Sequence, residues 1–398
     1  MDQTALDLQQ RILAVIARGV AQATTDEEFD GLAREVFVFQ YERCAPYRAY
    51  CDRLKLTPQT VTHWKQIPAV PTSAFKSFTL TCFPAEEAVA EFHTSGTTRE
   101  KAGKHYLRTL DLYEAAIRPN FAAYLVPDDA RLPMMVLMPS PQEAPHSSLS
   151  HMMGVVTREF GTENSEFYVE DGLLHVERVV RDLSEAQLAH RPVFLLGTAF
   201  AFVHLLDHLT RQGLKFEVAE GSRVMETGGF KGRSREMPKA ELYGLIERLI
   251  GVPKARIVNE YGMTELSTQF YDDSLRVNHQ TDRKAAPPWA RVVIIDPNTG
   301  RESAEMGRGL VRVYDLANMW SILCVQTEDL GVRRDPERID DHKRDARRTS
   351  GREGATTASR DACPTGEKAR ADGFEVVGRA AGAEVRGCSL TAEDLQLE

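Results

Sequence analysis

The sequence predicts an α/β protein in which a parallel β-sheet is followed by a smaller β-rich part. Between residues 192 and 265, short apolar runs of strand length alternate with segments that have one apolar face at helical spacing. Beyond Asp272, short β-branched runs alternate with turns. A chain of 398 residues, of which 42% are hydrophobic, is long enough to bury the cores of two or three domains.

The N-terminal part is predicted to be a helical scaffold of about residues 1–60. Two segments, residues 5–21 and 26–54, carry apolar side chains on one face at helical spacing. Pro68 and Pro71 then force an extended backbone, which ends the helical part.

The predicted strands and helices follow in order along the chain, and those across residues 192–265 form the parallel sheet. Strands are predicted at residues 88–92, 134–138, 192–196 and 222–226, and in the run that ends at Val258. The amphipathic segments 202–209 and 242–250 are predicted to be helices that cover the sheet. A loop is predicted over residues 146–154. Strands of the β-rich part are predicted at residues 291–295, 310–314 and 322–325.

Composition changes abruptly near the C-terminus. Residues 332–371 have no aromatic side chain, and Ile339 is their only large aliphatic one, so we expect a disordered insert. A natural elaboration and a local frame error in the gene would both give this composition. The predicted organisation is therefore a main domain over residues 1–331, with a β-rich subregion from about residue 285, followed by the insert and a short C-terminal segment over residues 372–398.

Charge and cysteine content limit the function. A net charge of -9 argues against a nucleic-acid partner, because phosphate backbones need a basic surface. The N-terminus lacks the apolar stretch of a secretory signal, and no run approaches the roughly 20 apolar residues of a membrane span, so we expect a cytoplasmic protein. The six cysteines include no C-x-x-C pair, which indicates neither a disulfide framework nor a zinc site.

The segment Ala255 to Glu265, ARIVNEYGMTE, ends a predicted strand in a dense group of polar residues. Open parallel sheets collect ligands at the carboxyl ends of their strands, so this group can reach one bound molecule. Tyr261 can stack on a flat base, Thr264 can donate to a phosphate, and Glu265 can hold Mg²⁺. An ordinary strand-to-helix corner, capped by Thr264 or Asn259, would use the same residue types.

A second polar segment follows the predicted strand at residues 88–92. It consists of His93, Thr94, Ser95, Gly96, Thr97 and Thr98, with Lys101 nearby. The amides and hydroxyl groups of such a loop can bind phosphate oxygens while the cation balances their charge. It is not a Walker loop, because the G-x-x-x-x-G-K-[ST] pattern is absent. A Ser/Thr-rich surface turn would have a similar composition.

Two further segments suit parts of a ligand. Gly228 and Gly229 directly follow a predicted strand, and two glycines there let a flat ring lie close against the backbone. Met152 and Met153 lie in the predicted loop, where flexible thioether side chains suit an alkyl chain.

These motifs resemble those of the adenylate-forming ligase superfamily, which includes acyl-CoA synthetases and luciferases. NEYGMTE is similar to its adenine and magnesium motif, and the glycine turn is similar to the turn that meets adenine. The loop from Thr94 to Lys101 resembles the phosphate loop, although Arg99 and Glu100 depart from the usual sequence. The resemblance implies an adenylate-forming ligase fold.

The chain is still more similar to the long-chain fatty acid protein ligases of bacterial bioluminescence, the acyl-protein synthetases that supply a reductase. Residues 326–331, QTEDLG, resemble the family segment whose aspartate, here Asp329, accepts from both ribose hydroxyls. Residues 372–379 resemble the following strand, which ends in Arg379. Asp329 is also well suited to be a turn residue beside Gly331.

The end of the chain fits the same family. Nineteen residues follow Arg379, where most acyl-CoA ligases have a full C-terminal domain. Acyl-protein synthetases are similarly short, and in them a cysteine near the C-terminus receives the acyl group. Cys388 matches this cysteine by position, although a small packing residue is the alternative.

The resemblance assigns a role to each motif. It implies that adenine is bound by Gly228, Gly229, Tyr261 and Gly262, and that the ribose is bound by Asp329 with help from Arg379. The phosphates would be bound by residues 94–98, Lys101 and Thr264, and the metal ion by Glu265. The acyl pocket would lie at His151, with Met152 beside it. The alternative for His151 is a structural residue of the loop, which is the more common role of a lone loop histidine.

The expected function is ATP-dependent and Mg²⁺-dependent activation of a long-chain fatty acid as its acyl adenylate. A protein cysteine then takes the acyl group and supplies a reductase partner. An acyl- or aryl-CoA ligase of the phenylacetate-CoA ligase type is an alternative, against which the short C-terminus argues. A non-catalytic nucleotide-binding scaffold is another, suggested by the altered phosphate loop and the interrupted ribose segment.

Overall fold

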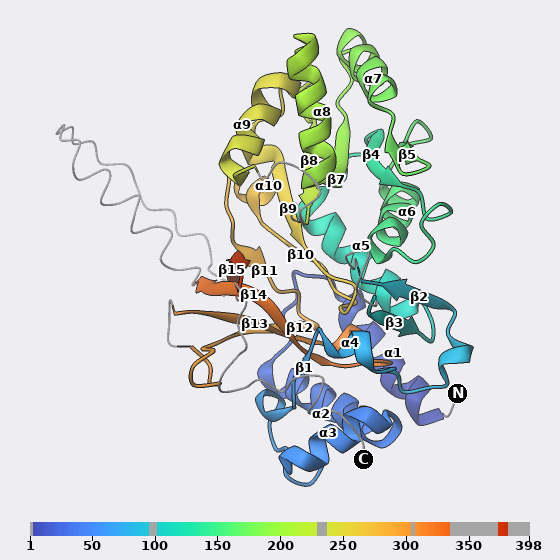
Figure 1. Ribbon diagram of the computed structural model, residues 1–398, viewed down its shortest axis with the longest axis vertical. Helices are drawn as coiled ribbons and strands as arrows, with labels where there is room; N and C mark the ends of the chain where they lie inside the picture. The colour runs from blue at the N-terminus through green and yellow to red at the C-terminus, as the bar shows by residue number, and fades with distance from the viewer. Residues whose placement is uncertain (1–2, 95–101, 229–236, 304–306, 335–372, 381–398) are drawn as a thin grey trace, which may run out of the picture.

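The structure is a computed structural model that describes residues 3–94, 102–228, 237–303, 307–334 and 373–380. Two sheets organise it (Figure 1). A seven-stranded sheet lies at one end of the molecule among helices α5 to α9, and a second sheet lies between it and the N-terminal helices. The described chain is therefore α/β, with the smaller β-rich part that the sequence predicts.

The seven-stranded sheet is parallel in its centre. Its strand order is β10 (Phe270–Tyr271), β9 (Ile257–Tyr261), β8 (Arg223–Thr227), β7 (Phe194–Thr198), β4 (Met134–Pro139), β5 (Glu166–Glu170) and β6 (Leu173–Leu174). The five central strands, β9 to β5, pair in parallel, and the two short edge strands are antiparallel. This confirms the parallel sheet predicted for residues 192–265.

Helices cover both faces of this sheet, as parallel sheets require. On one face lie α7 (Val176–Leu188), α8 (Ala199–Gln212) and α9 (Lys239–Ile250), and on the other lie α5 (Asp111–Leu125) and α6 (Ser148–Phe160). A further short helix, α10, spans Ser274–Val277. Strand residues alternate between the two cores: Leu195 and Val224 join the first, whereas Phe194 and Met225 join the second.

Helix α6 replaces the loop predicted over residues 146–154. Ser147 caps the helix, since its hydroxyl accepts from the Ser150 amide at 3.1 Å. Gly154 made the segment resemble a loop, but this residue is a packing requirement, because a Cβ here would meet the Pro141 ring at 2.5 Å. Met152 and Val156 are buried on the face that meets the sheet.

The second sheet has the order β11 (Lys284–Ala285), β15 (Gly373–Arg379), β14 (Cys324–Arg334), β13 (Arg308–Asp315) and β12 (Ala290–Ile295), with β1 (Val70–Pro71) parallel to β14. Strand β14 extends to Arg334, so its end lies three residues beyond the boundary predicted at residue 331. The rest of the predicted insert, residues 335–371, lies outside the described residues.

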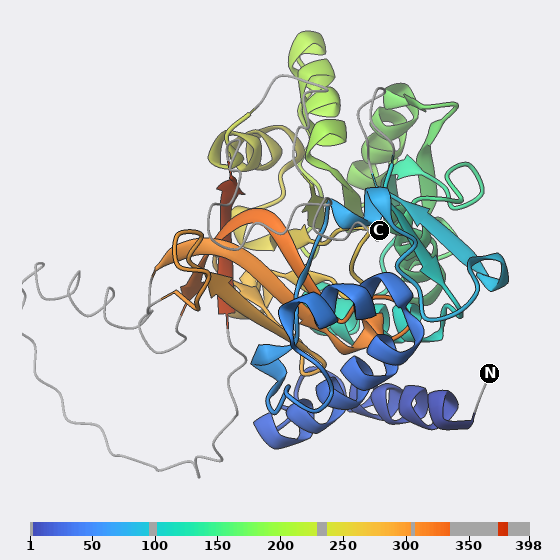
Figure 2. The same ribbon diagram turned by 60° about the horizontal axis from the view of Figure 1, so that its bottom comes forward.

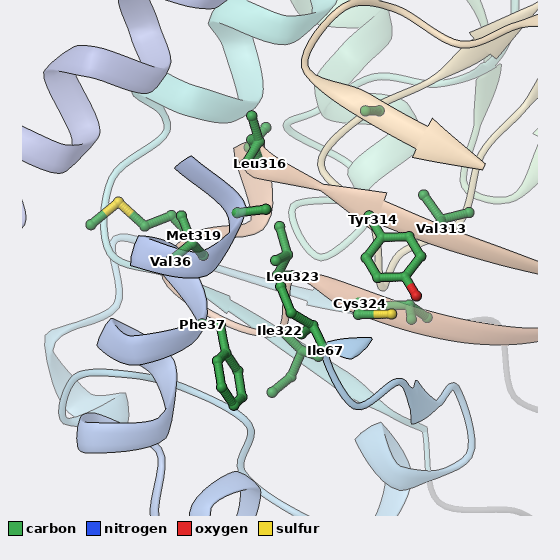
Figure 3. Packing of buried hydrophobic residues seen from close by; sticks show 14 of the residues in the cluster. Val36, Phe37, Ile67, Val313, Tyr314, Leu316, Met319, Ile322, Leu323 and Cys324 are labelled. Carbon is green, nitrogen blue, oxygen red and sulfur yellow. The ribbon is translucent and has the colours of Figure 1, made fainter. Parts of the chain in front are cut away.

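The N-terminal helices α1 (Gln3–Ala17), α2 (Asp26–Arg43) and α3 (Ala45–Leu54) pack on this second sheet. In Figure 2 the second sheet lies between these helices and α8 and α9. Figure 3 shows Val36 and Phe37 of α2 among buried side chains of the segment 313–324. The Gln40 amide donates to the carbonyls of Asn318 and Met319, each at 3.1 Å.

The predicted helix over residues 26–54 is in fact two helices. The chain leaves helical geometry at Cys44, with φ -96° and ψ 95°, and Pro46 occupies the first turn of α3, where a missing N–H has no cost. The predicted helix over residues 5–21 ends at Ala17.

Short elements complete the described chain: α4 (Ala74–Ser77), β2 (Ala90–His93), β3 (Lys104–Leu107), and 3₁₀ turns at Trp64–Gln66, Ala85–Glu87, Lys254–Arg256 and Leu316–Asn318. None of the helices in the described ranges combines the length and the apolar character needed to cross a membrane.

Candidate functional site

The candidate site lies at the carboxyl ends of β8 and β9, which are neighbours in register, with Thr227 opposite Glu260. Strand β9 runs through Asn259 and ends at Tyr261, three residues later than the sequence pattern predicted. At the end of β8, Gly228 has φ +74°, in the left-handed region that favours glycine, and a Cβ there would meet no atom within 4 Å. Among the described residues, no atom therefore fills the space beside the Gly228 backbone, and Gly229 lies outside the described residues.

Tyr261 joins this edge to the second sheet. Its hydroxyl donates to Asp329 Oδ2 at 2.8 Å, and its ring meets the Phe374 ring edge-on at 5.9 Å between centroids. Burial raises the pKa of Tyr261 well above its ordinary value, with the Asp329 charge as a further cause, so the phenol keeps its proton. The predicted adenine and ribose residues thus come from different sheets and touch each other.

Thr264 joins the same edge to the β2–β3 hairpin. Its hydroxyl donates to the His93 carbonyl at 3.2 Å, and the His105 ring donates through Nδ1 to the Thr264 carbonyl at 2.7 Å. A carbonyl can only accept, which fixes the proton on Nδ1. Burial lowers the pKa of His105 to about 4, so this ring is neutral near pH 7.

The predicted phosphate loop starts directly beside these contacts. The Thr94 amide donates to the Gly103 carbonyl at 2.9 Å, and the Gly103 amide donates to Thr94 Oγ1 at 2.8 Å. These two bonds close the base of the loop. Its other predicted ligands, Ser95, Gly96, Thr97, Thr98 and Lys101, lie outside the described residues.

Glu265 follows Thr264 and is 8% exposed. Its backbone carbonyl accepts from Asn318 Nδ2 at 2.7 Å, and Asn318 lies in the turn after β13. The position of the segment is therefore fixed by the second sheet. Carboxylate and hydroxyl oxygens are the hard donors that Mg²⁺ takes, so the Glu265 carboxylate and the neighbouring Thr264 hydroxyl fit this ion chemically.

Arg379 reaches the same region through strand pairing. Its Cα is the partner of Asp329 in the β14–β15 ladder, and its guanidinium donates to Glu328 Oε2 at 3.1 Å. This ion pair is largely exposed, with the Arg379 side chain 69% accessible. The strand that the sequence identified after the insert is thus confirmed, whereas Cys388 lies outside the described residues.

The two predicted acyl-pocket residues lie in different surroundings. His151 lines a cavity of about 440 Å³ together with Phe92 and Leu110, and its Nε2 lies 3.0 Å from Glu114 Oε1. Met152 is buried in the core against Tyr271, whose hydroxyl lies 3.7 Å from its sulfur, and it is not among the residues that line this cavity.

A buried polar network beneath the site was not predicted. It contains the buried residues Glu226, Glu260, Asp272 and Lys284 and the half-buried Asn259. Asn259 donates to Glu226 Oε1 at 2.7 Å, and its backbone amide donates to Asp272 Oδ2 at 2.7 Å. Paired carboxylates at the ends of two consecutive strands are the signal that could have revealed it, since the strand register joins Glu226 to Asn259.

Burial controls protonation in this network. It raises the pKa of Glu260 to about 7, although the Thr227 hydroxyl, which donates to the Glu260 carboxylate, acts in the opposite direction. It also raises the pKa of Glu226 and lowers the pKa of Lys284, which lies 3.6 Å from Asp272. Gly262 comes directly after Tyr261 at the end of β9. A Cβ at this position would overlap the Glu260 carboxylate, so any larger residue here would have to displace this group.

Comparison with known proteins agrees with these motifs. The family model described as "Acyl-protein synthetase, LuxE" matches residues 21–343. The long-chain-fatty-acid–luciferin-component ligase of Aliivibrio fischeri is 26% identical over 309 residues, which cover 76% of this chain and 78% of that protein. The ligase of the same name from Vibrio harveyi is 23% identical over 310 residues, covering 77% and 79%.

Solved structures agree on the fold. A 2-hydroxyisobutyryl-CoA ligase in complex with 2-HIB-AMP and CoA has a TM-score of 0.62 at 14% identity, covering 80% of this chain and 66% of that one. The same ligase in its postadenylation state has a TM-score of 0.58 at 14% identity, covering 78% and 64%. The chain thus spans about two thirds of the length of these ligases. It has the adenylate-forming ligase fold and belongs to the acyl-protein synthetase (LuxE) family of ligases.

Proposed function

We propose that this ligase activates a long-chain fatty acid with ATP, forms the acyl adenylate, and passes the acyl group to a cysteine thiol that supplies a reductase. Its family and the names of its two relatives support ATP-dependent acyl activation and suggest a long-chain fatty acid as the substrate. The residues at the candidate site support the adenylation step.

One observation carries the proposal: hydrogen bonds join four distant chain segments at one sheet edge. Thr264 bonds to the His93 carbonyl, 171 residues away, and Tyr261 bonds to Asp329, 68 residues away. Strand pairing then brings Arg379 beside Asp329. A core needs no such convergence of hydroxyl and carboxylate groups at the ends of parallel strands, whereas a nucleotide site does.

In the proposed reaction, a carboxylate oxygen of the fatty acid attacks the α-phosphorus of ATP, and pyrophosphate leaves. The thiolate then attacks the acyl carbon, and AMP leaves with that oxygen. Adenine lies against Gly228 and Tyr261. Asp329 accepts from the ribose hydroxyls, because a carboxylate has lone pairs enough to serve these as well as the Tyr261 hydroxyl.

Groups of the chain itself stabilise the negative charge that develops around the α-phosphorus during the reaction. The hydrogen bonds between Thr94 and Gly103 fix the base of the loop that supplies the remaining amides, hydroxyls and Lys101. Groups that are pre-organised around developing charge act without reorganising during the reaction. Glu265 would hold Mg²⁺, with Thr264 beside it, and the bound ion offsets negative charge on the triphosphate.

ATP–pyrophosphate exchange tests the proposal across fatty acids of increasing chain length. We expect exchange that depends on the fatty acid and is independent of coenzyme A. Glu265→Gln should reduce it by about 10²-fold, the usual loss when one pre-organised electrostatic partner is removed. Glu217→Gln, at an 83% exposed side chain, is the matched control and should exchange like the wild type.

Two results would contradict the proposal. Absence of exchange with every fatty acid would leave a nucleotide-binding scaffold as the better account. Release of acyl-CoA at a rate that exceeds transfer to protein would instead identify a coenzyme A ligase.

A further inference from the structure

We propose that Glu91, His93 and His146 form a binding site for a divalent transition-metal ion of the Zn²⁺ type, separate from the Mg²⁺ ligand Glu265. One ligand atom from each side chain lies within 4.8 Å of the other two. Imidazole nitrogens with one carboxylate favour zinc and its neighbours in the first transition series over Mg²⁺, which prefers oxygen.

The strand geometry accounts for two of the three ligands. Glu91 and His93 are two residues apart on β2, so their side chains leave the same face, while the intervening Phe92 is buried in the core on the other face. His93 Nε2 lies 2.5 Å from Glu91 Oε1. An ion would take the place of the hydrogen between these two atoms, and the displaced proton would move to Nδ1 or to solvent.

The third ligand is oriented by the backbone. His146 Nδ1 donates to the Glu91 carbonyl at 2.9 Å, and the His93 amide donates to the His146 carbonyl at 2.8 Å. Because a carbonyl can only accept, the proton of the neutral ring is on Nδ1, and the lone pair is on Nε2. A bond from the second ring nitrogen to a backbone carbonyl is the usual outer support of a metal-binding histidine.

The site is accessible, and its side chains must move to bind an ion. Glu91 and His146 line the cavity of about 440 Å³, which gives an ion a path from solvent. The rings of His93 and His146 are stacked, 4.3 Å apart and 2° from parallel. Ligands of one tetrahedral zinc ion lie about 3.3 Å apart, so both rings must turn toward the ion.

Lys104 limits the affinity. Its ammonium lies 2.7 Å from Glu91 Oε1, so the ion must share this carboxylate with a cation. We therefore expect weaker binding than at a structural zinc site. Binding would link β2 to the segment before α6 and would brace the hairpin that leads into the phosphate loop.

Titration of the chelator-treated full chain with Zn²⁺, in excess Mg²⁺ and without nucleotide, tests the site. We expect one equivalent to bind, and His93→Ala and His146→Ala to weaken binding by at least about tenfold. His146 is exposed, so its substitution should leave the fold intact. His204→Ala, at an exposed position on α8, is the matched control and should bind like the wild type.

Thermal melting gives a second readout, because an ion that binds only the folded chain raises Tm. The increase should occur in the wild type and disappear in His146→Ala. Absence of Zn²⁺ binding by the wild type, or unchanged binding by His146→Ala, would overturn the proposal. So would a Co²⁺ complex with intense sulfur-to-metal charge-transfer absorption, which would locate the ion at a cysteine.

Discussion

At the scale of single residues, the site combines contacts that a motif predicts with contacts that it does not. The order of Tyr261, Thr264 and Glu265 in the sequence was enough to predict a ligand site at the end of a strand. The bond between Tyr261 and Asp329 was not predictable, because it depends on how the second sheet meets the first. The resemblance to a family named Asp329, and the structure shows which side chain it touches.

Asp329→Asn should weaken the binding of ATP and should have little effect on the binding of the fatty acid. The substitution removes a charged acceptor, and hydrogen bonds to charged groups contribute about 1.5–3 kcal/mol, which is roughly ten- to a hundredfold in KM for ATP. Steady-state exchange kinetics would measure it. Glu328→Gln, which removes only the exposed ion pair with Arg379, should behave like the wild type. An unchanged KM for ATP in Asp329→Asn would exclude Asp329 from the ribose site.

Glu260 should make stability depend on pH. Its pKa is about 7 in the folded protein, above the ordinary value of 4.5, so the folded state holds the proton more tightly between these values. The stability from this carboxyl is fully present below pH 4.5, and the free energy of unfolding falls as pH rises to about 7.

Glu260→Gln should remove this dependence. Relative to the wild type, its free energy of unfolding should increase between pH 4.5 and 7 by up to about 3 kcal/mol. Urea denaturation at several pH values measures the difference, with the exposed Glu163→Gln as control. If the difference between Glu260→Gln and wild type is the same at every pH, Glu260 does not titrate in this range.

At the scale of elements, the strands were easier to predict than the boundaries. Apolar runs located β4, β7 and β8 within two residues at each end, because burial on both faces leaves a continuous signal. The break at Cys44 between α2 and α3 was missed, since helical periodicity continues across it. Helix α6 was missed because Gly154 and His151 obscured its pattern.

The β14–β15 pair predicts the result of a deletion. Arg334 and Gly373 face each other as the last described pair of this antiparallel ladder, which a two-residue Asn-Gly turn can close. Replacing residues 335–372 by such a turn should leave Tm unchanged or higher, because the shorter loop saves at most about 3 kcal/mol of closure entropy. Loss of cooperative melting would show that these residues contribute to the folded core.

At the scale of the whole molecule, burial makes the four described cysteines poor candidates for the acyl acceptor of the proposed reaction. Cys44, Cys51, Cys82 and Cys324 are buried. Burial raises the thiol pKa to about 11 at Cys44 and about 12 at Cys51 and Cys324, which suppresses the nucleophilic thiolate. Of the six cysteines, Cys363 and Cys388 lie outside the described residues, and we propose Cys388 as the acceptor because it matches by position in the family resemblance.

Cys388→Ser should leave acyl-adenylate formation largely intact and abolish a hydroxylamine-labile acyl label on the protein. A serine hydroxyl is a far weaker nucleophile than a thiolate, and its ester resists mild hydroxylamine. Labelling with radioactive fatty acid and ATP would measure this, with Cys363→Ser as the matched control that keeps the label. A label that persists in Cys388→Ser, or never forms in the wild type, would contradict self-acylation.

The polar network of Glu226, Asn259 and Lys284 could not be predicted from the sequence. Its members come from β8, β9 and β11, and only the assembled sheets bring them together. Single-sequence patterns report which face of an element is apolar, but not which buried polar groups meet across elements. The motif residues were predictable because one short segment carries several of them.

Oxygen transfer from the acid to AMP is the most direct test of acyl-adenylate formation. The full chain is incubated with MgATP, a long-chain fatty acid labelled with ¹⁸O in its carboxylate, and hydroxylamine as the acyl acceptor. Attack on the acyl carbon releases AMP that keeps one carboxylate oxygen, so mass spectrometry should find one ¹⁸O in AMP and none in pyrophosphate. Label in inorganic phosphate with ADP as the product, or AMP without label, would contradict an acyl adenylate.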